Sequence, residues 1–90
     1  MNKARRKVID AVLEILEGVR DQIENIHDQE EEAFDNIPES LEGTEKYDQM
    51  EEAVSNLDDA LTSIEEAIDS LDCARGVEYE ETYDHAAPVD

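Results

Sequence analysis

The chain of 90 residues has no tryptophan, only 4% aromatic residues and a single cysteine. No apolar run approaches the roughly 18 residues that a membrane-spanning helix requires. The stretch VIDAVLEILEGV after the basic first residues is interrupted by acids, so it does not have the core of a signal peptide. The single Cys73 cannot form an internal disulfide, and this favours a reducing compartment such as the cytoplasm.

Basic residues are also scarce after the first seven positions. The chain has 27 acidic and 7 basic residues, with a net charge of −20 at pH 7. Four of the bases precede the first acid, so residues 8–90 contain only Arg20, Lys46 and Arg75 as cations. Such a surface repels DNA, RNA and anionic membranes, and it attracts basic proteins. The composition therefore excludes ordinary nucleic-acid binding and membrane binding.

Apolar residues recur at alternating spacings of three and four in two segments, which predicts two long coiled-coil helices. We expect the first helix over residues 2–34, with Asn2 as its N-cap. Its predicted seam consists of Ile9, Val12, Leu16, Val19, Ile23, Ile26, Glu30 and Ala33. We expect the second helix over residues 44–75, with Thr44 as its cap and Gly76 as its stop. The second seam consists of Tyr47, Met50, Val54, Leu57, Leu61, Ile64, Ile68 and Leu71.

The segment DNIPESLEG, residues 35–43, contains a proline and a glycine and is predicted to link the helices. A short connection between two long helices favours an antiparallel hairpin. If residues whose numbers sum to 80 are paired, each apolar residue of the first seam from Ile9 to Ile26 lies opposite an apolar residue of the second. The pairs run from Ile9 with Leu71 to Ile26 with Val54. We therefore predict an all-α fold, an antiparallel two-helix coiled-coil hairpin over residues 1–76 that can dimerise into a four-helix bundle. Residues 77–90 are predicted to be an acidic tail.

A row of acidic residues follows the first predicted helix with the same period as its seam. The row consists of Asp10, Glu14, Glu17, Asp21, Glu24, Asp28, Glu31 and Asp35. The second predicted helix adds Glu51, Glu52, Asp58, Asp59, Glu65, Glu66 and Asp72. Two such helices side by side carry one charge per roughly 2.5 Å, close to the one per about 1.7 Å of duplex DNA. We call these residues the predicted acidic ridge and place it opposite the apolar seam.

The predicted acidic ridge has two interpretations that the sequence leaves open. It either binds a basic protein surface, for example that of a nucleic-acid-binding protein, or it is a solvated face that only keeps the protein soluble. Like charges at three- and four-residue spacing cost a few tenths of a kcal/mol per pair, and natural helices usually mix in lysine to avoid this cost. The absence of bases from the row on the first helix favours binding.

Small and apolar residues beside the two seams are candidates for contacts between chains. They are Ala53, Ala60, Ala67 and Ala74, which share one heptad position, and Val8, Leu13 and Ile15 on the first helix. Alanine is also a good helix former, and the apolar side chains also cover the edge of a hairpin. A two-helix core is thin, however, and small residues at regular spacing allow close helix packing. These residues predict a homodimer or partner contact, and the alternative function is a structural or oligomerisation module.

No catalytic, cofactor or metal site is predicted. Glu24 and His27 match the Glu-x-x-His pattern of di-iron bundles, but that pattern needs two inward-facing copies and occurs once here. Cys73 lies among acids, which make a thiol less reactive, and His85 lies in the predicted tail. The chain is therefore predicted to be non-enzymatic.

The stretch EEEAFDNIPESLEGTEKYDQMEEAVSNLDDALTSIEEAIDSL resembles a group of small acidic helical proteins of phages and mobile elements in Gram-positive bacteria. The linker FDNIPESLEG is the distinctive part, because acidic heptads alone arise by convergence. The resemblance implies a bacterial cytoplasmic setting and transfers no functional residues. Small acidic phage proteins often inhibit host enzymes that handle nucleic acids, including defence nucleases. The resemblance therefore favours a DNA-mimic inhibitor of a host nuclease or other DNA-binding defence protein.

Overall fold

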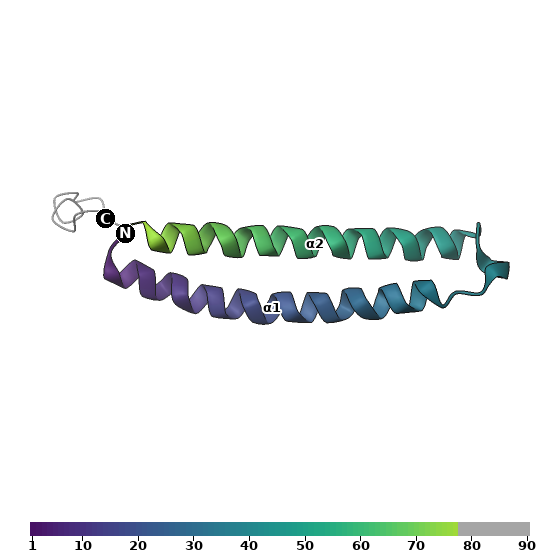
Figure 1. The fold of residues 1–90 in the computed structure, drawn as a ribbon, viewed down its shortest axis with the longest axis horizontal. Coiled ribbons are helices and arrows are strands. Elements are labelled where there is room, and N and C mark those ends of the chain that lie inside the picture. Colours follow the sequence, from purple (N-terminus) through teal and green to yellow (C-terminus); the bar gives the residue numbers. More distant parts are fainter. Residues whose placement is uncertain (78–90) are drawn as a thin grey trace.

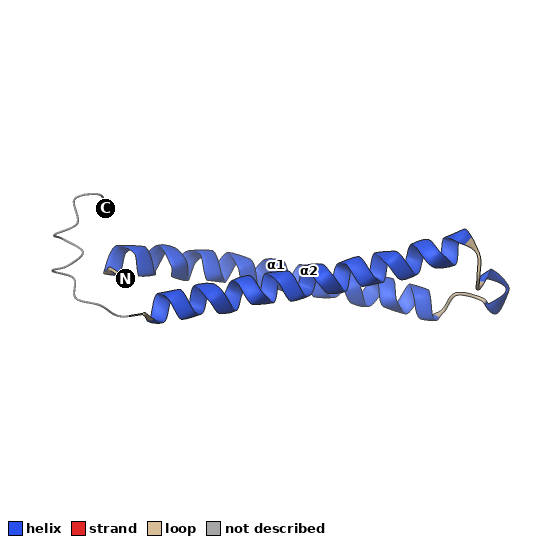
Figure 2. Cartoon of the chain, turned by 90° about the horizontal axis from the view of Figure 1, so that it is seen from above, coloured by secondary structure: helices blue, strands red, loops and turns tan. Residues whose placement is uncertain are grey.

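A computed structural model describes residues 1–77, which form an antiparallel helical hairpin (Figures 1 and 2). Helix α1 spans Lys3–Asp35, a 3-10 turn η1 spans Glu39–Leu41, and helix α2 spans Glu45–Gly76. Both long helices begin and end one residue later than predicted. The predicted all-α hairpin is confirmed. Most of the predicted tail, residues 78–90, lies outside the described residues.

Side chains cap the start of both long helices. The Asn2 side chain accepts a hydrogen bond from the backbone N–H of Arg5 at 2.9 Å. The Thr44 hydroxyl accepts one from the backbone N–H of Tyr47 at 3.3 Å and donates to the carbonyl of Leu41. Each cap satisfies a backbone donor that the first helical turn leaves without an intrahelical acceptor. Just before Thr44, Gly43 has φ +79°, a left-handed conformation that glycine adopts without steric cost.

Replacing Thr44 by alanine should lower the free energy of unfolding by about 1 kcal/mol, the usual value of an N-cap. The loss arises because the N–H of Tyr47 is left without its side-chain acceptor. Urea unfolding followed by circular dichroism measures the change. The matched control Thr44→Ser keeps the hydroxyl and should remain close to the wild type. Equal losses in both variants would contradict a capping role.

The face that α1 packs against α2 differs in part from the predicted seam. All eight predicted seam residues of α2 are partly buried, and so are Ile9, Leu16 and Ile23 of α1. The predicted seam of α1 consists of two rows, in each of which residues recur every seven positions. The row of Val12, Val19, Ile26 and Ala33 is wrong, because these residues are exposed. The row one residue further along replaces it, and this row consists of Leu13, Arg20, His27 and Phe34.

Helix α1 is therefore rotated by about 50° from its predicted orientation, the angle between neighbouring rows of a heptad. Side-chain size explains part of this difference. Leu13 is 6% exposed and is the one buried apolar residue within residues 1–77. The ring of Phe34 packs against that of Tyr47 with centroids 4.9 Å apart. Burying leucine and phenylalanine removes more apolar surface from water than burying the neighbouring valine and alanine.

The register along the hairpin agrees with the prediction to within one residue. Phe34 contacts Tyr47, and Leu13 and Ile68 line the same groove. In both pairs the two residue numbers sum to 81, whereas they sum to 80 in the predicted pairing. The rotation therefore changes which sides of α1 face solvent, while the helices keep their alignment.

Candidate functional site

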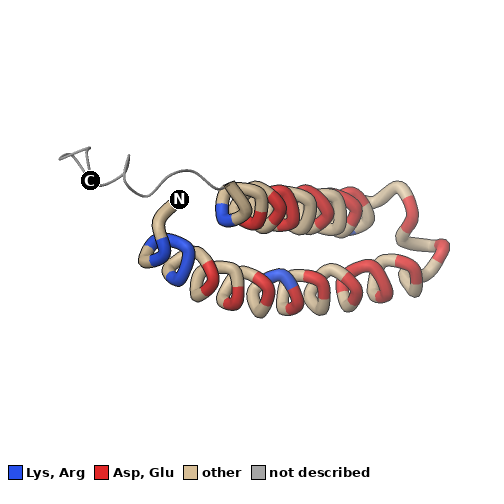
Figure 3. Tube along the Cα trace, turned by 60° about the vertical axis from the view of Figure 1, so that its left-hand side comes forward, with Lys and Arg blue, Asp and Glu red and all other residues tan. Residues whose placement is uncertain are grey.

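The rotation of α1 places its acidic row beside the packing face, whereas the sequence placed it opposite. Two contacts across the hairpin show which side of α2 this row faces. The imidazole of His27 contacts Asp58, and the guanidinium of Arg75 contacts Asp10. The acidic row of α1 and the row of α2 that contains Asp58 therefore lie on one side of the hairpin. Figure 3 shows that acids continue along both helices, whereas bases gather at the start of α1.

We call this side the acidic face and define it by thirteen carboxylates. They are Asp10, Glu14, Glu17, Asp21, Glu24, Asp28, Glu31 and Asp35 of α1, and Glu51, Asp58, Glu65, Asp69 and Asp72 of α2. All residues of the predicted acidic ridge are exposed, but Glu52, Asp59 and Glu66 lie on the back of α2, away from α1. The structure adds Asp69, which was not predicted to belong to the ridge. Asp72, which was predicted, continues the seven-residue spacing of Glu51, Asp58 and Glu65.

A groove of about 420 Å³ opens between the helices toward the free ends of the hairpin. Its lining consists of Asp10, Leu13, Glu14, Glu17, Ile68, Asp69, Asp72 and Arg75. One nitrogen of Arg75 lies 2.8 Å from Asp10 Oδ1, and the other pairs with Asp72. The groove lining thus contains one cationic side chain and five carboxylates, so the groove remains strongly negative.

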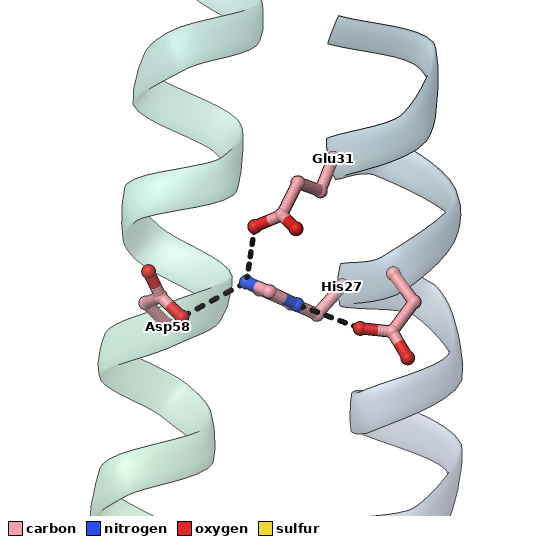
Figure 4. A network of polar contacts seen from close by, with 4 residues as sticks. His27, Glu31 and Asp58 are labelled. Carbon is pink, nitrogen blue, oxygen red and sulfur yellow. Dashed lines mark hydrogen bonds and ion pairs between the residues drawn. The ribbon is translucent and has the colours of Figure 1, made fainter. Parts of the chain in front are cut away.

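His27 is a buried polar residue on the acidic face of the hairpin, with 8% of its surface exposed (Figure 4). Its Nδ1 lies 3.2 Å from Asp28 Oδ1, and its Nε2 lies 2.8 Å from Asp58 Oδ1 and 3.7 Å from Glu31 Oε2. The hydrogen bond with Asp28, followed by the charges of Asp58 and Glu31, raises the His27 pKa above its ordinary value, although burial opposes the shift. The contact between His27 and Asp58 links α1 to α2.

The predicted seam of α1 does not include His27, and in this respect it is wrong, because His27 is buried. The signal that could have found it is spacing, because His27 lies seven residues before Phe34 and fourteen after Leu13. A histidine in a row with leucine and phenylalanine is compatible with burial once carboxylates surround it. The ordinary heptad assignment favoured Ile26 instead, because isoleucine is the more apolar neighbour.

The contribution of His27 to stability should fall as the pH rises. The folded pKa lies above the unfolded value of about 6.5, so the contribution is complete below about pH 6.5 and is lost as the pH rises through the folded pKa. Thermal unfolding of the wild type and His27→Gln, compared from about pH 5.5 to about pH 8.5, measures it. The advantage of the wild type should be largest at the acidic end. A constant advantage, or one that grows with pH, would be inconsistent with a protonated His27.

The described residues 1–77 contain one cysteine and one histidine, Cys73 and His27. Within residues 1–77, no group of three His, Cys, Asp or Glu side chains is placed to hold a metal ion. Cys73 is exposed on α2 and forms no disulfide, and His85 lies outside the described residues. Neither helix has the length and apolar character needed to cross a membrane.

The predicted contacts between chains divide into core and surface residues. Leu13 belongs to the core, so its assignment as an oligomer contact is corrected. Val8 and Ile15 are 63% and 65% exposed. Of the four alanines of α2, Ala53 and Ala74 are partly buried and the other two, Ala60 and Ala67, are exposed. Both sets follow the edge of the seam away from the acidic face, because they occupy the heptad rows on its other side.

The hairpin therefore presents two unlike surfaces along its length. One is the acidic face, with its groove and its buried histidine. The other carries exposed aliphatic and small side chains. Comparisons of the chain with protein-family models, with curated proteins and with solved structures gave no match.

Proposed function

We propose that this protein is a non-enzymatic binding protein whose acidic face docks on the basic surface of a DNA-binding protein. The observation that supports this proposal most directly is that the acidic rows of both helices share one side of the hairpin. At about 1.5 Å rise per residue, the α1 row presents one charge per roughly 5 Å of helix and the α2 row one per roughly 8 Å. The two rows together give one charge per roughly 3 Å, which is about half the linear charge density of duplex DNA. A groove that binds DNA would therefore meet a rod with a continuous line of negative charge.

Several carboxylates of the acidic face are available for such a partner. Glu14, Glu17 and Glu24 are exposed and have no ion-pair partner within residues 1–77. Their mutual repulsion costs free energy in the isolated chain, and cationic side chains of a partner would relieve it. Binding of this kind speeds encounter and weakens as salt screens the charges.

The sharpest form of the proposal is competitive inhibition of a host nuclease or another DNA-binding defence protein. The resemblance to small acidic proteins of phages and mobile elements supports this form. The same resemblance implies a bacterial cytoplasmic location, which is part of this proposal. The partner loses DNA binding because the hairpin occupies the basic groove.

The test is capture of host proteins on the immobilised full chain at about 50 mM and about 200 mM salt, followed by challenge with duplex DNA. We expect the retained proteins to be basic DNA-binding proteins that elute with salt and are displaced by the DNA. Retained proteins that resist both salt and DNA would contradict mimicry of a polyanion. A nuclease recovered in this way should lose activity on addition of the chain in stoichiometric amount.

The exposed Val8 and Ile15 favour a second candidate function, that of a structural or oligomerisation module. The two functions use opposite sides of the hairpin and are compatible. Partner binding that survives charge reversal on the acidic face but is lost in Ile15→Asp would favour the module instead.

A further inference from the structure

One long side of the hairpin carries no charge. On α1 this side consists of Val8, Ala11, Val12, Ile15, Gly18, Val19, Gln22, Asn25, Ile26 and Gln29. On α2 it consists of Gln49, Ala53, Asn56, Ala60, Ser63, Ala67, Ser70 and Ala74. We call these residues the uncharged face. In a chain of which 38% is charged, an uninterrupted neutral surface on both helices needs a physical reason.

The α1 part of the uncharged face is a second coiled-coil stripe without a partner helix. Val8, Ile15 and Ile26 are 63%, 65% and 53% exposed, and Val12 and Val19 are also exposed. These five residues recur at the heptad spacings of three and four, with one gap at Gln22. A single partner helix covers only the adjacent stripe, so α2 leaves this one in water. Contiguous exposed aliphatic side chains of this kind mark an interaction surface.

We infer that the uncharged face packs against the same face of a second copy of the chain, which forms a two-fold symmetric four-helix bundle. This inference does not depend on what the acidic face binds. A second copy carries the same −20 charge and is repelled by every acidic surface. Contact through the neutral side avoids that repulsion. It also leaves the two acidic faces on opposite outer sides, about two helix layers or 20 Å apart, beyond the Debye length of about 8 Å.

The uncharged face is complementary to itself in the antiparallel direction. On α1, Val8 lies opposite Ile26 of the second copy and Ile15 opposite its Val19, with the two-fold axis at the level of residue 17. On α2, Ala60 lies opposite Ala67 of the second copy, with the axis between residues 63 and 64. Within one hairpin, the level of residue 17 on α1 coincides with that of residues 63 and 64 on α2. The reason is that the register follows the predicted pairing to within one residue. Both helices therefore share one two-fold axis, as an isologous interface requires.

Charge at the ends of the uncharged face selects the antiparallel arrangement. Within the heptad rows of this face on α1, the first charged residue before it is Arg5 and the first one after it is Glu32. Antiparallel pairing brings Arg5 of one copy near Glu32 of the other, whereas parallel pairing sets like charges together. The face is about 32 Å long and about 18 Å wide, or roughly 600 Å² per copy. That area reaches the lower end of the range for stable protein interfaces.

Sedimentation equilibrium of the full chain tests the proposal. We expect a mass of twice 10.2 kDa at micromolar concentration. Ile15→Glu should raise the dissociation constant at least about tenfold, because it places two carboxylates near the axis. The control Thr62→Glu adds the same charge on the acidic side of α2 and should leave the dimer intact. A monomeric wild type at about 100 μM, or a dimer that survives Ile15→Glu, would overturn the inference.

Cysteine crosslinking tests the direction of the pairing in a Cys73→Ser background. A mixture of Val8→Cys and Ile26→Cys chains should give a disulfide-linked dimer on oxidation, because these positions lie opposite each other. Either variant alone should crosslink far less. Efficient crosslinking of Val8→Cys with itself would show a parallel pair and overturn the antiparallel arrangement.

Discussion

Charge reversal at Glu14, Glu17 and Glu24 to lysine should weaken binding to the basic partner at least about 100-fold. Each reversal removes an attractive pair and adds a repulsive one, and about 1 kcal/mol lost at each of three positions already amounts to about 100-fold. Helicity should be kept or should increase, since each lysine gains acidic neighbours three or four residues away. Titration calorimetry at low salt measures the affinity, and circular dichroism measures the helix content.

These three positions are chosen because they are exposed and have no ion-pair partner within residues 1–77. Asp21 and Asp28 are less suitable, because Asp21 pairs with Arg20 and Asp28 contacts His27. Changes there would mix a loss of binding with a loss of internal contacts.

The matched control reverses Glu52, Asp59 and Glu66 on the back of α2. It changes the net charge by the same amount, but it leaves the acidic face intact. Binding should fall much less in this control than in the variant of the acidic face. Equal losses would show that net charge alone attracts the partner, and no loss in either variant would exclude the acidic face as the binding surface.

Leu13→Ala should lower the free energy of unfolding by about 2–3 kcal/mol, within the range for a buried leucine. Leu13 is 6% exposed, and a hairpin of this size has a thin core with little stability in reserve. We therefore expect part of the population to be unfolded at room temperature in the variant and the unfolding midpoint in urea to shift strongly. Circular dichroism during urea titration measures both changes.

The control Ile15→Ala removes a side chain two residues further along that is 65% exposed. At low protein concentration it should cost far less than Leu13→Ala. At high concentration its cost should grow, because a dimer adds stability by mass action and Ile15 lies in the proposed interface. Equal costs for the two variants at every concentration would indicate that α1 packs in the orientation predicted from the sequence.

Much of the fold follows from periodicity and end signals. The apolar spacing predicted two helices of the observed length, and Asn2 and Thr44 marked their starts. The pairing of the two seams predicted the hairpin register to within one residue. These features are local or depend on the alignment of two regular patterns, so a single sequence contains them.

The rotation of α1 could not be predicted in the same way. Apolar residues occupy four neighbouring rows of this helix, and a single partner helix covers only two of them. The choice among rows depends on side-chain volumes at the ends of the helix, such as Leu13 and Phe34. It also depends on whether carboxylates of the opposite helix can receive His27. Both are contacts between segments far apart in the chain.

The sequence by itself determined which residues are acidic, how they recur and that two long helices carry them. Only the tertiary structure decided that the acidic rows of both helices share one face, with the aliphatic and alanine rows on the other. The physical reason is that heptad spacing specifies the order of rows around each helix, whereas packing specifies which rows are turned toward the partner. A rotation of about 50° therefore moved the acidic row from the back of the hairpin to its side and exposed the stripe from Val8 to Ile26.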